Sequence, residues 1–175
     1  MSSRLIVISG PIAAGKSTVA QALAAQVRAH GESAAVIDLD VVYEMLATGP
    51  KSDRATWTLA REASATFANA LLSSGVRHVV LEGEYWTESD REPVVRLSQW
   101  APRFVTLTVA YEVALARAQA DPTRRASKDP SFLAGQHAKF NAVLASITAP
   151  DIVVDTSVGG AAAIAAAILA STCVS

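Results

Sequence analysis

Residues 10–18 contain the pattern that most restricts how this chain can fold. They read Gly-Pro-Ile-Ala-Ala-Gly-Lys-Ser-Thr and match Gly-x-x-x-x-Gly-Lys-[Ser/Thr]. The residues before them, 5–8, form a short apolar run that is typical of a buried parallel strand. After the pattern, Val19, Leu23 and Val27 recur every fourth residue, which predicts one apolar face of a helix. A strand, a glycine-rich turn and a helix in this order predict a phosphate-binding loop.

The chemistry of this loop predicts a nucleotide site. A glycine at each end lets the backbone turn tightly and direct successive N–H groups at phosphate oxygens. The N-terminus of the following helix adds partial positive charge. Lys16 would reach the β- and γ-phosphates, and the Ser17 hydroxyl would bind Mg²⁺. We therefore expect ATP or GTP with Mg²⁺. The expected contacts are Gly10, Ala13, Ala14, Gly15, Lys16, Ser17 and Thr18.

Length and composition limit the class of protein further. A chain of 175 residues is enough for one well-buried α/β domain, residues 1–175, and too short for two ordinary ones. The formal net charge of −1 and the lack of a Lys/Arg run give no reason to expect a nucleic-acid partner. No stretch is apolar and long enough to cross a bilayer, and the single cysteine, Cys173, fits a reducing compartment. We expect a soluble cytoplasmic protein, whose oligomeric state the sequence leaves open.

Strand and helix patterns alternate along the rest of the chain, which predicts a parallel sheet covered by helices on both faces. Right-handed crossovers place the carboxyl ends of all strands at one edge, where ligands bind. The candidate functional residues are therefore those that follow the strands. Further strands are predicted over residues 33–37, 77–81, 104–109 and 151–155, and further helices over residues 41–47, 53–74, 87–100, 112–120, 131–146 and 160–170.

Acidic residues follow the second and third strands. A kinase that acts on an alcohol needs a carboxylate to orient the hydroxyl and accept its proton, and another can lie near the metal. We expect Asp40 to be the base and Asp38 to lie nearer Mg²⁺, with the alternative that one of them only caps the next helix. Glu82, after the third strand, is expected to accept from Mg²⁺-bound water.

Two further segments at this edge are candidates for substrate contact. Glu84, Tyr85 and Trp86 follow the third strand, and their rings could equally contact substrate or pack on the next helix. The helices between residues 41 and 75 are expected to form the substrate pocket. Their candidate contacts are Tyr43 and Arg54.

The polar segment 121–130 is bounded by prolines and carries three cations, which predicts a lid. An arginine brought in by a closing lid can stabilise charge on the γ-phosphate oxygens. We expect Arg124 or Arg125 to have this role, with a solvated basic loop as the alternative.

In segment order, nearly the whole chain resembles the small phosphate-loop kinases around shikimate kinase, gluconate kinase, adenylylsulfate kinase and chloramphenicol phosphotransferase. Residues 10–18 match best, and residues 38–40, Asp-Leu-Asp, look like the Asp-x-Asp of shikimate kinases. Residues 105–124 resemble the fourth strand of these kinases, the helix after it and the lid. Residues 151–156 resemble their last strand and the turn that follows it. The resemblance implies a three-layer fold with sheet order 2-3-1-4-5. It implies these roles: Asp40 as the substrate-binding base, Arg124 on the phosphates, and Arg117 and Thr156 near the adenine.

The sequence departs from shikimate kinases after the third strand, where a run of glycines is replaced by Gly-Glu-Tyr-Trp at residues 83–86. A carboxylate at Glu84 would repel a small anionic acid such as shikimate. The segment suits a larger, partly apolar, neutral or cationic molecule with an exposed hydroxyl, although Arg54 and Arg61 still allow an anionic group.

These features predict an ATP-dependent O-phosphotransferase that acts on a small molecule, with an antibiotic as one candidate. Two alternatives stay open. The first is a kinase for a nucleoside, a nucleotide or a sugar acid. The second is a regulatory nucleotide hydrolase, although the chain lacks an Asn-Lys-x-Asp base-reading motif.

Overall fold

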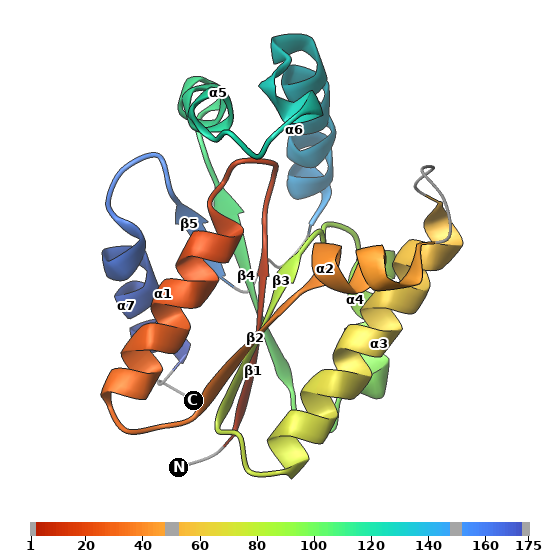
Figure 1. Ribbon diagram of the computed structural model, residues 1–175, viewed down its shortest axis with the longest axis vertical. Helices are drawn as coiled ribbons and strands as arrows, with labels where there is room; N and C mark the ends of the chain where they lie inside the picture. The colour runs from red at the N-terminus through yellow and green to blue at the C-terminus, as the bar shows by residue number, and fades with distance from the viewer. Residues whose placement is uncertain (1–2, 48–52, 148–151, 173–175) are drawn as a thin grey trace.

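A computed structural model describes residues 3–47, 53–147 and 152–172 of the chain. Within these ranges, five strands form one parallel sheet in the order β2-β3-β1-β4-β5, which confirms the predicted order (Figure 1). The strands are β1 (Arg4–Ser9), β2 (Ala34–Asp38), β3 (His78–Gly83), β4 (Pro102–Thr108) and β5 (Ile152–Asp155). Residue 151, the predicted start of the last strand, and Cys173 lie outside the described residues.

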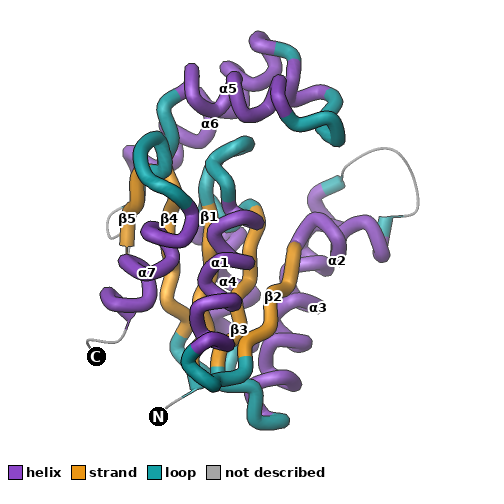
Figure 2. Tube along the Cα trace, turned by 60° about the vertical axis from the view of Figure 1, so that its left-hand side comes forward, coloured by secondary structure: helices purple, strands orange, loops and turns teal. Residues whose placement is uncertain are grey.

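Helices cover both faces of the sheet, as the alternating pattern predicted. α1 and α7 pack on one face, α3 and α4 pack on the other, and α5 and α6 stand above the carboxyl ends of the strands (Figures 1 and 2). No helix in the described ranges is both long enough and apolar enough to cross a membrane. The helices are α1 (Lys16–Ala29), α2 (Leu39–Leu46), α3 (Arg54–Ser73), α4 (Glu88–Leu97), α5 (Tyr111–Ala120), α6 (Pro130–Ser146) and α7 (Ala161–Thr172), with a short 3-10 helix, η1 (Ala126–Lys128).

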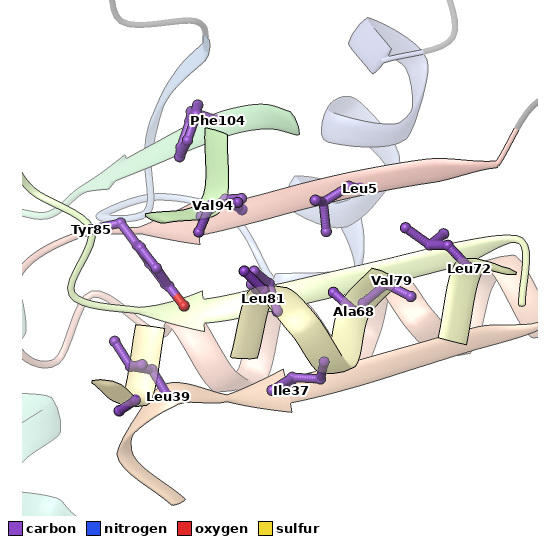
Figure 3. Packing of buried hydrophobic residues seen from close by; sticks show 13 residues of the cluster. Leu5, Ile37, Leu39, Ala68, Leu72, Val79, Leu81, Tyr85, Val94 and Phe104 are labelled. Atoms are coloured by element: carbon purple, nitrogen blue, oxygen red, sulfur yellow. The ribbon is translucent and has the colours of Figure 1, made fainter. Parts of the chain in front are cut away.

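The core is divided by the sheet into two layers. Along β1, Leu5 and Val7 belong to the cluster under α3 and α4, while Ile6 and Ile8 belong to the cluster under α1 and α7. Successive side chains of a strand point to opposite faces, so a strand covered on both sides must be apolar throughout. The continuous apolar runs of the sequence are therefore explained by helices on both faces. Figure 3 shows the first of these clusters.

Side-chain caps set where several helices begin. Asp53 accepts a hydrogen bond from the Thr56 N–H at 2.8 Å, and Thr87 forms a capping box with Asp90, so the predicted starts of α3 and α4 are confirmed. Asp38 accepts from the Asp40 N–H at 2.8 Å and begins α2 at Leu39, two residues before the predicted start at residue 41. This earlier start places Asp40 on a helix.

The close approach of β3 and α2 depends on Gly83, the last residue of β3. Gly83 has a φ of +153°, and a Cβ atom there would lie 2.5 Å from the Leu39 Cβ atom. Any larger residue would push α2 away from the end of β3. Asp40 lies on α2 and Glu84 directly follows β3, so this close approach brings both carboxylates to one edge of the sheet.

We expect Gly83→Ala to lower the free energy of unfolding by about 1–3 kcal/mol, because the new methyl group overpacks against Leu39. Chemical denaturation measures the change. Gly135→Ala is the matched control, because Gly135 lies inside α6 with no atom within 4 Å of a Cβ placed there. The control should raise stability by up to about 1 kcal/mol, the helix propensity gain. Equal stability of the two variants would contradict the close contact.

Candidate active site

An open cleft of about 630 Å³ lies at the carboxyl ends of the strands. Its walls come from the loop after β1, from α2, from the start of α3, from the end of β3 and from the segment between α5 and α6. The structure thus brings the donor loop, the predicted substrate helices and the predicted lid to one cavity. The roles of individual residues below stay predictions, while their positions are observed.

The donor wall is the glycine-rich loop. Ala13 and Gly15 have φ values of 63° and 85°, in the left-handed region, and α1 begins directly after Gly15. Such turns gather backbone N–H groups into a concave anion site. The N-terminus of α1 has no side-chain cap, so its first N–H groups are left for a ligand. The loop therefore fits the triphosphate of a nucleotide. The donor residues that line the cleft are Ala13, Gly15, Lys16, Ser17 and Thr18.

Lys16 lies across its own loop. Its Nζ donates to the carbonyl oxygens of Gly10 at 3.1 Å and Pro11 at 3.2 Å. Burial lowers the pKa of Lys16, while the carboxylates of Glu84 and Glu82 raise it. The ammonium group is thus held among acidic side chains, at the border between the donor loop and the opposite wall.

The three residues predicted at the metal come together beside this lysine. Asp38 and Glu82 are register partners in β2 and β3, and Ser17 is near enough to the Glu82 carboxyl to lower its pKa. Burial, with the Asp38 charge, raises the pKa of Glu82 to about 7. Among the described residues, no three His, Cys, Asp or Glu side chains cluster closely enough to hold a metal by themselves. This fits Mg²⁺, which keeps several waters and needs one or two protein carboxylates beside the phosphates. Asp38 also caps α2, and this capping role is compatible with the predicted position near Mg²⁺.

We expect Glu82→Gln to stabilise the free protein in a pH-dependent way. The pKa in the folded state lies above the 4.5 of an ordinary glutamate, so wild-type stability falls as pH rises from about 4.5 to 7. The variant should gain little near pH 5 and on the order of 1–3 kcal/mol near pH 8, at about 1.4 kcal/mol per pKa unit. Denaturation with EDTA present measures this. The exposed Glu112 gives the control Glu112→Gln, and an equal gain at both pH values would contradict the assignment.

The wall opposite the donor loop carries acidic and aromatic groups from three elements. Asp40 on α2 lines the cleft together with Glu84 from the end of β3. Burial raises the pKa of each carboxyl, while the Lys16 charge lowers it. Tyr43 stacks on Trp57 with ring centroids 4.0 Å apart and an interplanar angle of 17°. The predicted base thus faces the donor lysine, beside a flat aromatic surface.

The segment 121–130 contributes the upper wall, and Arg124 is its cation in the cleft. The Arg124 Nε lies 3.2 Å from Asp121 Oδ2. Arg125, the other candidate, is exposed and does not line the cleft. His137 on α6 pairs through Nε2 with the Ile12 carbonyl oxygen at 3.0 Å, which connects this upper layer to the donor loop. Of the two predicted arginines, the structure places Arg124 in the position that the prediction requires.

Arg117 and Thr156, the residues predicted near the adenine, contact each other outside the cleft. Arg117 Nη2 donates to the Thr156 carbonyl oxygen at 2.6 Å. The Thr156 hydroxyl donates to the Ala14 carbonyl oxygen at 2.9 Å. The turn after β5 is therefore fixed to the donor loop.

Tyr85 requires a correction. Its side chain is fully buried and packs in the core near Leu39 and Leu81 (Figure 3). Its N–H donates to the Ser9 hydroxyl at 3.1 Å, which ties the segment after β3 to the end of β1. The expected contact with substrate is therefore wrong. The ring fills space between the sheet and α3. Residue type alone could not show whether this ring packs in the core or contacts substrate.

Trp86 and Arg54 also lie away from the cleft lining. The indole Nε1 of Trp86 donates to the Gly10 carbonyl oxygen at 3.0 Å, and its ring meets Phe140 edge-on. Arg54 is exposed at the start of α3. Trp86 thus connects the donor loop to α6 through its hydrogen bond and its ring contact. Neither residue is placed for the predicted substrate contact.

Several cleft residues were not predicted. Glu44 lies four residues after Asp40 on α2, so the helical spacing could have indicated that both share a face. Trp57 could have been suspected only from its place near the start of α3. The remaining lining residues that sequence reasoning missed are Ile12, Asp121, Ala126, Ser127 and Phe132.

A model of a family described as an AAA domain matches residues 5–150. The chain belongs to this AAA-domain family. A search of curated proteins finds no match for the AAA-domain chain. Solved structures match it over almost its whole length, at identities that show a shared fold.

Three of these structures illustrate the likeness. A sugar kinase from Janibacter sp. HTCC2649 has a TM-score of 0.69 at 17% identity, covering 99% of this chain and 96% of its own. A gluconokinase from Sinorhizobium meliloti 1021 has a TM-score of 0.63 at 20% identity, covering 97% and 91%. The tunicamycin resistance protein of Deinococcus radiodurans has a TM-score of 0.67 at 16% identity, covering 97% and 95%. The predicted fold resemblance to small phosphate-loop kinases is confirmed.

Proposed function

We propose that this AAA-domain protein is a kinase that transfers the γ-phosphate of ATP to a hydroxyl group of a small molecule. The observation that carries the proposal is the composition of the cleft. One cavity holds Lys16 of the donor loop, Arg124 of the upper segment and the carboxylate of Asp40. A cation pair for the transferring group and a base for the acceptor are the parts that phosphoryl transfer needs.

In this reaction, the acceptor hydroxyl oxygen forms a bond to the γ-phosphorus while the bond to the β-phosphate oxygen breaks. The hydroxyl proton passes to the Asp40 carboxylate, and ADP is the leaving group. Lys16 and Arg124 neutralise charge on the γ-phosphate oxygens. Partial desolvation raises the pKa of Asp40 above its ordinary value, which makes it a stronger base than an ordinary aspartate.

The proposed reaction also includes Mg²⁺, because the cleft contains residues that would hold this ion. Ser17 and Glu82, with Asp38 behind them, offer the hard oxygen ligands that this ion prefers. When bound, Mg²⁺ neutralises negative charge on the β- and γ-phosphates.

Two features favour a kinase over a regulatory hydrolase. The cleft continues beyond the donor loop to the wall of Asp40, Tyr43 and Glu84, which a hydrolase acting only on its nucleotide has no need of. Structures that share the fold carry names such as sugar kinase and gluconokinase. An antibiotic acceptor is supported only by the name of the tunicamycin resistance protein, so it stays a narrower proposal. We further propose a cytoplasmic location, where ATP is abundant.

A stimulation assay tests the proposal. ADP formation is measured with ATP or GTP and Mg²⁺, with and without each member of a panel of hydroxylated small molecules. We expect one class of compound to stimulate ADP formation and to gain one phosphate by mass spectrometry. Hydrolysis that no small molecule stimulates, but that a protein partner does, would favour the regulatory hydrolase instead.

A further inference from the structure

The half of the cleft opposite the donor loop, lined by Asp40, Tyr43, Glu44, Trp57 and Glu84, is called the acceptor half here. It carries negative charge from α2 and from the residue after β3. Asp40 and Glu44 lie four residues apart on α2, and Glu84 follows β3. Asp40 interacts electrostatically with Glu44, and Glu84 interacts with Asp40, so the three carboxylates form one group. Lys16 offsets the repulsion between these like charges only in part, because it also interacts with Glu82, so a positively charged ligand group would relieve the remainder.

The cations that line the cleft, among the described residues, are Lys16 and Arg124, and both lie on the donor side. Lys16 donates to loop carbonyls, and Arg124 lies beside Asp121. Arg61, which could have received an anionic substrate group, is buried behind the wall. Its Nη2 donates to the Glu84 carbonyl oxygen at 2.8 Å and lies 3.1 Å from Asp90 Oδ1. Among residues 3–47, 53–147 and 152–172, the acceptor half thus offers no further arginine or lysine to an anion.

The same half carries a flat aromatic surface. Tyr43 and Trp57 are stacked, and both line the cleft. Aromatic faces attract ammonium groups and also pack against flat or apolar groups. Arg61 already lies 5.8 Å from the Trp57 ring centroid, so this pair favours a flat or apolar portion of the ligand, while the carboxylates favour its positive charge.

We propose that the acceptor is a hydroxylated amine, positively charged at neutral pH, with an apolar or flat portion. The inference rests on the proposed function and narrows the substrate class from neutral or cationic to cationic. The ammonium group lies between Glu44 and Glu84, the apolar portion lies against the Tyr43–Trp57 pair, and the hydroxyl faces Asp40. The transfer step is unchanged: the hydroxyl oxygen gains the phosphoryl group, Asp40 accepts the proton and ADP leaves.

Matched triples of compounds test the charge preference. The first triple is 2-amino-1-phenylethanol, its N-acetyl derivative and mandelate, which share a benzylic hydroxyl. The second is glucosamine, N-acetylglucosamine and gluconate. We expect the amine of each triple to bind best by saturation-transfer NMR and to be phosphorylated with a kcat/KM about 10-fold or more above its N-acetyl form.

The two proposals fail in different ways. Amines that bind preferentially but give no phosphorylated product would contradict the kinase and leave the cationic preference standing. Phosphorylated product from the N-acetyl compounds or the acids, at rates equal to the amines, would support the kinase and overturn the cationic preference. Failure of both amines to bind would also overturn it.

Variants that remove a negative charge test which carboxylates cause the preference for a cationic acceptor. Glu84→Gln and Glu44→Gln should each raise the KM of an amine about 10-fold and leave the KM of its N-acetyl partner within about two-fold. Glu112→Gln is the control, because Glu112 is an exposed carboxylate on α5 outside the cleft. An equal rise for amine and N-acetyl compound would show that the carboxylates only shape the wall, and it would overturn the inference.

Discussion

Asparagine in place of Asp40 should lower kcat about 10²–10⁴-fold, the usual contribution of a general base. Asparagine keeps the size of the side chain and a hydrogen-bond acceptor, so KM for the acceptor should change little. Asp40 lines the cleft with Lys16, and burial raises its pKa. In the wild type, kcat should therefore rise with pH as Asp40 ionises and then level off. The variant should lose this limb of the pH profile.

The comparison requires an intact fold. The Asp40 N–H donates to the Asp38 carboxylate through its backbone, so Asp40→Asn leaves the cap of α2 in place. Thermal unfolding should confirm that the two proteins are equally stable. Full phosphotransfer by the variant, with unchanged affinity for the acceptor, would show that Asp40 is not the base. A raised KM with unchanged kcat would reduce its role to binding.

Replacement of Arg124 by alanine should lower kcat about 10³-fold or more, because an arginine that reaches the transferring phosphoryl group stabilises charge that develops only in the transition state. The structure supplies a neighbouring control. Arg124 lines the cleft and pairs with Asp121, whereas Arg125 is exposed outside it. Arg125→Ala should retain kcat within about two-fold, since a solvated surface charge contributes little.

Steady-state kinetics with the best acceptor from the stimulation assay distinguish the two arginines. Isothermal titration with ADP should show that both variants still bind nucleotide, because the donor loop is unchanged. Equal losses of kcat in the two variants would favour a general electrostatic effect of the segment over direct contact by Arg124. A loss confined to Arg125→Ala would reverse the assignment.

Much of the fold could be predicted because its signals are local. Each strand is a short apolar run, α1 and α3 have a periodic apolar face, and caps such as Asp53 and Thr87 mark where helices begin. Handedness rules then bring the carboxyl ends of parallel strands to one edge. The sheet order came from the resemblance to small phosphate-loop kinases, since local patterns do not specify which strands are neighbours.

The acceptor site could be predicted only in part. Asp40, Tyr43 and Glu84 were expected at the substrate, and all three line the cleft. Tyr85 and Trp86 were equally good candidates by residue type and position, yet one is buried in the core and the other braces the donor loop. An aromatic ring next to the end of a strand can face a ligand or pack against protein. The packing of the surrounding elements determines which of the two occurs.

The sequence by itself determined the donor half of the cleft, because residues 10–18 are contiguous and their function depends on local backbone geometry. Only the tertiary structure decided the acceptor half. Contacts between distant segments paired Tyr43 with Trp57, placed Arg61 behind Glu84, and turned Arg124 rather than Arg125 toward the cavity. Such contacts depend on how the elements pack in space, which no local pattern records.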